Sequence, residues 1–170
     1  MISNIEDRES MYIKGYLSCI GSCPYEGDVP IGKIVDSVVK FKDIGVNEIC
    51  LADTIGDLKK EKLEDILEQI SRTGIWSGDK LSIHLHVDFE SYYWKEVISV
   101  ALKYNILKYD TSILNLGGCP AIYKKCNDDK LNGNLNIYKA LEFFEDEGYD
   151  LNVNKQIVRE VEDRWKDFLL

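Results

Sequence analysis

The sequence predicts an α/β fold in which repeated strand–helix units build a parallel sheet. Short β-rich, mostly apolar runs alternate with segments whose apolar residues recur at helical spacing. Glycines follow several of the helical segments and mark their ends. The residues of chemical interest come at or after the carboxyl ends of predicted strands, where parallel α/β folds build their sites.

Four strands are predicted from these short runs. They are expected at Tyr12–Cys19, Glu48–Ala52, Leu81–His86 and Tyr109–Leu114. Because a helical segment separates each strand from the next, the connections favour parallel pairing of the strands.

Five helices are predicted from apolar stripes. Asp28 and Pro30 signal the start of the first helix, and Gly45, Gly74 and Gly148 end the first, second and fourth. The stripes span Ile31–Val39, Leu63–Ile70, Trp94–Ala101, Leu135–Glu147 and Ile157–Phe168.

The chain, with 170 residues, is long enough for one domain with a real core. Residues 1–11 are expected to be a polar lead-in, and residues 12–170 a domain of four parallel β/α units plus a C-terminal helix. Four units make half of an eight-stranded (β/α)8 barrel. Left open, such a sheet would expose apolar edges and one apolar face, so we expect dimerisation or poor solubility.

Charge and composition exclude several functions. The formal net charge of -9 argues against nucleic-acid binding, since little would attract a polyphosphate. No apolar run approaches a membrane span, and the acidic N-terminus does not resemble a signal or transit peptide, so we expect a cytoplasmic protein without membrane contact. The 5 cysteines form an odd set that suits reduced thiols.

The only 2 histidines of the chain, His84 and His86, lie two residues apart in a predicted strand. Both imidazoles therefore face the same side of the sheet, close enough to share a metal ion. Cys119, after a Gly-Gly pair, and Asn134 add a thiol and an amide oxygen further along the chain. The alternative is a pair of core or surface histidines beside a glycine turn.

Six motifs, in one order across Lys14–Tyr149, resemble those of the 3-hydroxy-3-methylglutaryl-CoA lyases. The matches are Lys14–Cys19 with R-G-Y-[VL]-S-C, Cys23–Gly27 with C-P-Y-E-G, Leu51–Gly56 with G-D-T-I-G, His84–His86 with H-x-H, Ser112–Pro120 with S-V-A-G-L-G-G-C-P, and Gly133–Leu135 with G-N-[LV]. The wider group that includes isopropylmalate and homocitrate synthases shares the H-x-H but generally lacks the cysteine-proline motifs.

The resemblance implies that a 3-hydroxyacyl-CoA is cleaved to acetyl-CoA and a keto acid, acetoacetate, with the help of a divalent cation, Mg²⁺ or Mn²⁺. It implies that His84, His86 and Asn134 bind the metal, with His84 also serving in catalysis. It further implies that Lys14, Tyr16, Gly117 and Gly118 contact the acyl-CoA substrate.

Two further catalytic residues follow from the resemblance. Cys119 is expected to protonate the enolate that cleavage leaves; its alternative is a buried structural thiol. Asp53 is expected to position substrate or relay protons; its alternative is a cap at the start of the following helix.

The resemblance covers only the second half of the family's barrel. The first four units carry an Arg-Asp pair, with one metal-binding carboxylate, that this chain lacks. We therefore expect little activity from the chain alone, and a requirement for an N-terminal half-barrel chain or for a second copy of itself. The alternatives are a catalytically inactive remnant or binding module, or a related acyl-CoA condensing enzyme.

Overall fold

In a computed structural model of the chain, which describes residues 10–88, 91–118 and 132–169, parallel strands form the central sheet. Their order is β1 (Lys14–Leu17), β4 (Glu48–Asp53), β5 (Leu81–Val87) and β6 (Tyr109–Asp110), and every neighbouring pair is parallel. This order follows the chain, as expected for one arc of a barrel.

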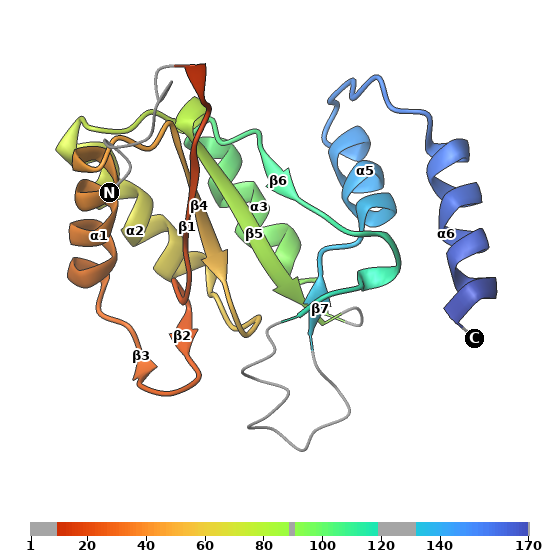
Figure 1. Cartoon of the computed structure of the whole chain (residues 1–170), viewed down its shortest axis with the longest axis horizontal. Coiled ribbons are helices and arrows are strands. Elements are labelled where there is room, and N and C mark those ends of the chain that lie inside the picture. The colour runs from red at the N-terminus through yellow and green to blue at the C-terminus, as the bar shows by residue number, and fades with distance from the viewer. Residues whose placement is uncertain (1–9, 89–90, 119–131, 170) are drawn as a thin grey trace.

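Five α-helices follow the strands in the described part of the chain. They are α1 (Ile31–Asp43), α2 (Lys60–Thr73), α3 (Tyr93–Lys103), α5 (Ile137–Asp146) and α6 (Lys155–Leu169). Figure 1 shows α1, α2 and α3 on one side of the sheet, with α5 and α6 side by side beyond β6. Gly45, Gly74 and Gly148 all have positive φ, which confirms the predicted helix ends.

The short elements were not predicted from the sequence. They are the hairpin of β2 (Ser22–Cys23) and β3 (Gly27–Asp28), the 3-10 turns η3 (Gly78–Lys80) and η4 (Ile113–Asn115), and β7 (Gly133–Asn134), which pairs antiparallel with β5. The predicted strand at Tyr109–Leu114 is wrong beyond Asp110, because the chain turns into η4, where Leu114 has a φ of 53°.

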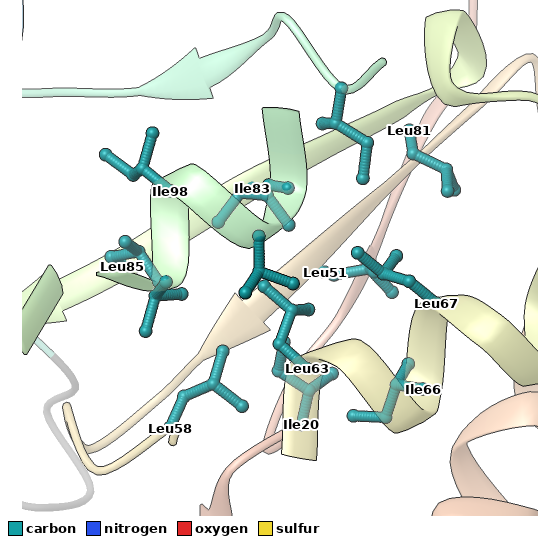
Figure 2. Close-up of a cluster of buried hydrophobic side chains, with 14 of the residues drawn as sticks. Ile20, Leu51, Leu58, Leu63, Ile66, Leu67, Leu81, Ile83, Leu85 and Ile98 are labelled. Carbon is teal, nitrogen blue, oxygen red and sulfur yellow. The ribbon is translucent and has the colours of Figure 1, made fainter. Parts of the chain in front are cut away.

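The apolar core lies between one face of the sheet and the helices. Leu51 of β4 and Ile83 of β5 are fully buried, and Figure 2 shows them against side chains of α2 and α3 such as Leu63 and Ile98. Alternation along each strand sends these side chains to one face, and the helical stripes cover them.

The opposite face of the sheet, by contrast, is polar. We call it the polar face; it carries Lys14, Tyr16, Glu48, Cys50, Ser82, His84, His86 and Asp110, which contact one another in hydrogen bonds and ion pairs. The expectation of an exposed apolar face is therefore wrong. An ionic network covers the side that the helices leave open.

Within the described part of the chain, helix α6 has an apolar stripe that is exposed to solvent. Its large side chains remain at least one third exposed: Ile157, Val161, Trp165 and Phe168. Glu162 is buried instead, where it accepts hydrogen bonds from the Asn136 amide and the Leu114 backbone N–H. Polar contacts therefore hold α6 in place, while its apolar stripe stays open.

At the amino end of the polar face, the buried Glu48 carboxylate receives three hydrogen bonds. Lys108 Nζ and Tyr12 OH each donate at 2.7 Å, and Ser82 Oγ donates at 2.8 Å. Burial alone would raise the pKa of Glu48, but these donors lower it to about 2 from a usual 4.5.

Glu48 should therefore make the chain sensitive to acid. Because its folded-state pKa lies below the unfolded value, its ionised form contributes stability that is present above pH 4.5 and is lost as the pH falls towards 2. We expect a contribution of roughly 3 kcal/mol. Urea unfolding at several pH values measures it. The Glu48→Gln variant should be less stable at neutral pH and lose less stability on acidification, and parallel pH curves for the two proteins would contradict this role.

Candidate metal centre

The two imidazoles lie side by side on the polar face, as the His-x-His spacing predicts. His84 Nε2 and His86 Nε2 are 3.1 Å apart. His86 Nδ1 lies 2.7 Å from the Thr54 carbonyl oxygen, which accepts its proton and leaves Nε2 as the lone-pair nitrogen. Burial, and secondly the neighbouring charge of His84, lower the pKa of His86 and favour its neutral, ligating form.

Asn134 reaches this pair through β7. It sits directly opposite His86 in the antiparallel register, and its Nδ2 donates to the Leu116 carbonyl at 2.8 Å. Its Oδ1 is buried and accepts no hydrogen bond of good geometry within the described residues. The amide oxygen is therefore the atom left over for a ligand.

Gly117 permits the close approach of Asn134. It has a φ of +95°, and a Cβ at this position would lie 2.4 Å from Asn134 Nδ2. Gly118 follows with a φ of 155°. Gly117 therefore lies beside Asn134, and the contact of Gly117 and Gly118 with the acyl-CoA substrate stays a prediction. Cys119, however, lies outside the described residues.

Asp110 is a member of the site that the sequence analysis missed. Its carboxylate accepts hydrogen bonds from Lys14 Nζ at 2.7 Å and Tyr16 OH at 2.9 Å, and its Oδ2 lies 3.5 Å from His84 Nδ1. Burial would raise the pKa of Asp110, but the His84, Lys14 and Tyr16 contacts together hold it well below its usual range. The carboxylate thus stays ionised behind the His84 ring.

Lys14 and Tyr16 were expected to bind substrate, but the structure directs their polar atoms to Asp110. The register explains this contact, since Tyr16 lies opposite Cys50 on the neighbouring strand, and alternate residues of β1 face the same side as Asp110. A carboxylate at the end of a very short strand gives no periodic signal. The contact of Asp110 with Lys14 and Tyr16 of β1 could have been found only from the pairing of the strands.

Asp53 does not join this group. It is fully buried, and its carboxylate accepts backbone N–H groups of Gly56 and Leu58 at 3.0 Å and of Asp57 at 3.3 Å. Burial raises its pKa to about 6. These contacts place the Asp53 carboxylate in the turn that leads into α2, close to the capping alternative, and its catalytic role stays a prediction.

The donor atoms present suit a divalent cation. Two nitrogens that are each about 2.1 Å from one ion lie roughly 3.0–3.4 Å apart, depending on the coordination angle. The 3.1 Å between the imidazoles fits a shared ion, and equally a shared proton. Behind the rings, the Thr54 carbonyl and the Asp110 carboxylate occupy the positions that orient ligating histidines in metal sites.

Two neutral imidazoles and one amide form an incomplete ligand set. Within residues 10–88, 91–118 and 132–169, no three His, Cys, Asp or Glu side chains gather in a way that could hold a metal ion. Hard cations such as Mg²⁺ prefer anionic oxygen ligands. Any ion bound here would take further ligands from substrate, water or another chain.

No family model matches the chain. It is similar in sequence to curated hydroxymethylglutaryl-CoA lyases. It is 32% identical to the mitochondrial enzyme of Arabidopsis thaliana, over 71% of this chain and 25% of that enzyme. It is 33% identical to the mitochondrial enzyme of Mus musculus, over 65% of this chain and 33% of that enzyme. A Bacillus subtilis lyase is 29% identical over 70% and 38%. The matched region thus spans well under half of each relative's length.

Solved structures of the same enzymes share the fold. The HMG-CoA lyase of Brucella melitensis superposes with a TM-score of 0.80 at 23% identity, covering 94% of this chain and 53% of that one. The Bacillus subtilis lyase superposes with a TM-score of 0.79 at 24% identity, covering 94% of this chain and 50% of that one. An Acinetobacter baumannii lyase in complex with coenzyme A and 3-methylmalate superposes with a TM-score of 0.78 at 18% identity, covering 95% of this chain and 49% of that one. The chain therefore has the fold of half of these barrels, as the sequence predicted.

Proposed function

The chain is a homologue of the hydroxymethylglutaryl-CoA lyases, and from that premise we propose that it supplies the metal-binding half of a lyase active site. The reaction would be cleavage of 3-hydroxy-3-methylglutaryl-CoA to acetyl-CoA and acetoacetate. The observation that carries the proposal is the convergence of His84, His86 and Asn134 at one end of the polar face.

The proposed cofactor is one divalent cation, Mg²⁺ or Mn²⁺, held by the lone pairs of His84 Nε2 and His86 Nε2 and by Asn134 Oδ1. When bound, it would supply Lewis acidity to the hydroxyl and carbonyl oxygens of the substrate. Thr54 and Asp110 would fix the orientation of the two rings from behind. For Lys14 and Tyr16 we propose a positioning role, because both hold the Asp110 carboxylate in place.

Cleavage also requires proton transfer, since the enolate of acetyl-CoA must be protonated. We propose the Cys119 thiol for this step. Gly117, which lies close to Asn134, and Gly118 precede Cys119 in the chain, and we propose that both contact the acyl-CoA substrate. The solved neighbour that holds coenzyme A supports an acyl-CoA substrate for this fold.

We further propose that activity requires a complementary half-barrel. The solved lyases are about twice as long as the region they share with this chain. Two surfaces could receive such a half: the outer edge of β1, which pairs only with β4 among the described strands, and the apolar stripe of α6. That complementary half would also supply the anionic ligand that the described residues do not provide.

Mixing this chain with the N-terminal half-barrel of a homologous lyase tests the function. With Mn²⁺ and 3-hydroxy-3-methylglutaryl-CoA, the mixture should release acetyl-CoA, the chain alone should not, and His84→Ala should abolish the release. If gel filtration shows a complex of the two halves that releases no acetyl-CoA, the chain is a binding module or remnant. Release from other acyl-CoA substrates only would favour a related condensing enzyme.

The Gly117→Ala substitution should weaken cation binding although it replaces none of the proposed metal ligands. An added methyl group would overlap Asn134 Nδ2, and alanine would be strained at the φ of +95° that Gly117 has, so Asn134 must shift from its position opposite His86. We expect about a tenfold loss of Mn²⁺ affinity by calorimetry. Gly32→Ala is the matched control, because a Cβ there meets nothing within 4 Å. Equal affinities for the two variants would argue against Asn134 as a ligand.

A further inference from the structure

Of the α6 side chains that the structure describes, Glu162 alone is buried, and it is a carboxylate. It is 8% exposed, whereas the apolar stripe of the same helix faces solvent. An amphipathic helix normally packs its apolar stripe on the core and leaves its charged groups outside. Burial of a charged group costs free energy unless hydrogen bonds compensate it. The contacts of this carboxylate therefore contribute more to the position of α6 than apolar burial does.

One oxygen of Glu162 joins two segments that are distant in sequence. Its Oε1 accepts hydrogen bonds from Asn136 Nδ2 at 2.6 Å and from the Leu114 backbone N–H at 3.3 Å. Asn136 also caps α5, because its Oδ1 accepts the Lys139 N–H at 3.0 Å. Leu114 has a φ of 53°, a left-handed conformation that persists only where the surroundings hold it. Glu162 thus helps to fix both the start of α5 and the turn at η4.

These two segments are the ones that position Asn134. Asn136 follows it by two residues, and Leu114 precedes Leu116 by two residues. The Leu116 carbonyl accepts the hydrogen bond of Asn134 Nδ2 at 2.8 Å, which leaves the buried Oδ1 for a ligand. Glu162 is therefore bonded to both segments whose mutual contact sets the direction of the Asn134 amide.

We propose that Glu162 is a positioning residue for the cation site, and that α6 thereby regulates the cation affinity of that site. This inference rests on the proposed function, since it takes Asn134 Oδ1 as a ligand. A complementary half-barrel that packs on the apolar stripe restrains α6, and Glu162 passes that restraint to Asn136 and Leu114. The Asn134 amide is then held opposite His86 before the cation arrives. By linkage, cation binding strengthens the hold on α6 to the same extent.

Titration calorimetry with Mn²⁺ compares two variants that each remove one contact of α6. Glu162→Ala should lower the Mn²⁺ affinity of the chain by roughly three- to thirtyfold. Arg159→Ala is the matched control, because Arg159 bonds to the Tyr138 hydroxyl of α5 and lies 4.6 Å from the centre of its ring. This variant should bind Mn²⁺ as the native chain does. Equal affinities for the two variants would overturn the proposal.

An exchange of the two polar partners separates the contact from misfolding. Asn136→Asp keeps the oxygen that caps α5 but places a second carboxylate against Glu162, so Mn²⁺ binding should weaken. Adding Glu162→Gln to this variant restores a hydrogen bond in the opposite direction, from the glutamine amide to the aspartate. The double variant should recover most of the lost affinity. If it binds no better than Asn136→Asp alone, the contact does not position the site.

A measurement without metal keeps this inference separate from the proposed function. In NMR spectra of the metal-free chain, the side-chain amide signals of Asn134 should shift in Glu162→Ala and stay in place in Arg159→Ala. If these signals shift but the native chain binds no Mn²⁺, the proposed cation site fails while the positioning of Asn134 by Glu162 is supported. If the Asn134 signals are the same in Glu162→Ala as in the native chain, the inference is overturned.

Discussion

The His86→Ala substitution should abolish most of the affinity of this chain for Mn²⁺. His86 is the better prepared of the two imidazoles, because the Thr54 carbonyl fixes its tautomer and its pKa is lowered. Removing it deletes one nitrogen ligand and leaves Asn134 without the residue opposite it on β5. The loss in affinity should exceed the roughly 10–100-fold that is typical when only an outer partner of a ligand is removed.

Titration calorimetry with Mn²⁺ measures this loss, and two further variants separate direct from indirect effects. Asp110→Asn should cost only about 10–100-fold, since Asp110 faces the far nitrogen of His84. Gly32→Ala, in α1 where an added Cβ meets nothing within 4 Å, should bind as the native chain does. If His86→Ala binds Mn²⁺ with the affinity of the native chain, the two histidines are not the ligands of the cation.

The Leu51→Ala substitution should have the largest effect on stability. Leu51 lies in the centre of β4, is fully buried and packs against the helices that cover the apolar face. Truncation of a buried leucine to alanine costs about 2–5 kcal/mol, because apolar contacts are lost and a cavity remains. That is a large part of the 5–15 kcal/mol by which a typical domain is stable.

Urea unfolding of Leu51→Ala and Leu107→Ala tests this assignment with the same chemical change. Leu107 is 56% exposed, so its truncation should change the free energy of unfolding by less than about 0.5 kcal/mol. If both substitutions change the free energy of unfolding by a similar amount, the helices do not bury the face of β4 that carries Leu51.

Much of the fold could be predicted from the sequence because periodic patterns produce it. The apolar runs of β4 and β5 and the stripes of α1 and α2 repeat over several residues, and Gly74 ends its helix as predicted. The elements that were missed are too short to show a period. β7 is two residues long, and it pairs with β5, where Asn134 lies opposite His86 although the two residues are distant in sequence.

The candidate site divides in the same way. Two histidines at a spacing of two on one strand must share a side, so their proximity follows from local geometry alone. The position of Asp110 depends on the register between β5 and β6, and the sequence does not fix that register. Asp53 illustrates the converse: a motif placed it at a strand end, but only the backbone N–H groups of the following turn decide where its carboxylate points.

The polar face changes the expectation for the half-barrel itself. An apolar open face would have predicted aggregation, whereas Lys14, Glu48 and Asp110 form ion pairs across the strands. The exposed apolar surface is instead on α6, at the edge where a barrel would continue. A complementary half would therefore meet an apolar helix and a strand edge, with the polar face turned towards the interior.

Electron spin echo measurements on Mn²⁺ added to this chain test the central claim directly, because they count the nitrogen nuclei bound to the ion. The arrangement of His84 Nε2 and His86 Nε2 at 3.1 Å predicts two directly coordinated imidazole nitrogens in the native chain and one in His84→Ala. A spectrum without nitrogen coupling, or one that His84→Ala leaves unchanged, would contradict a shared cation at this pair.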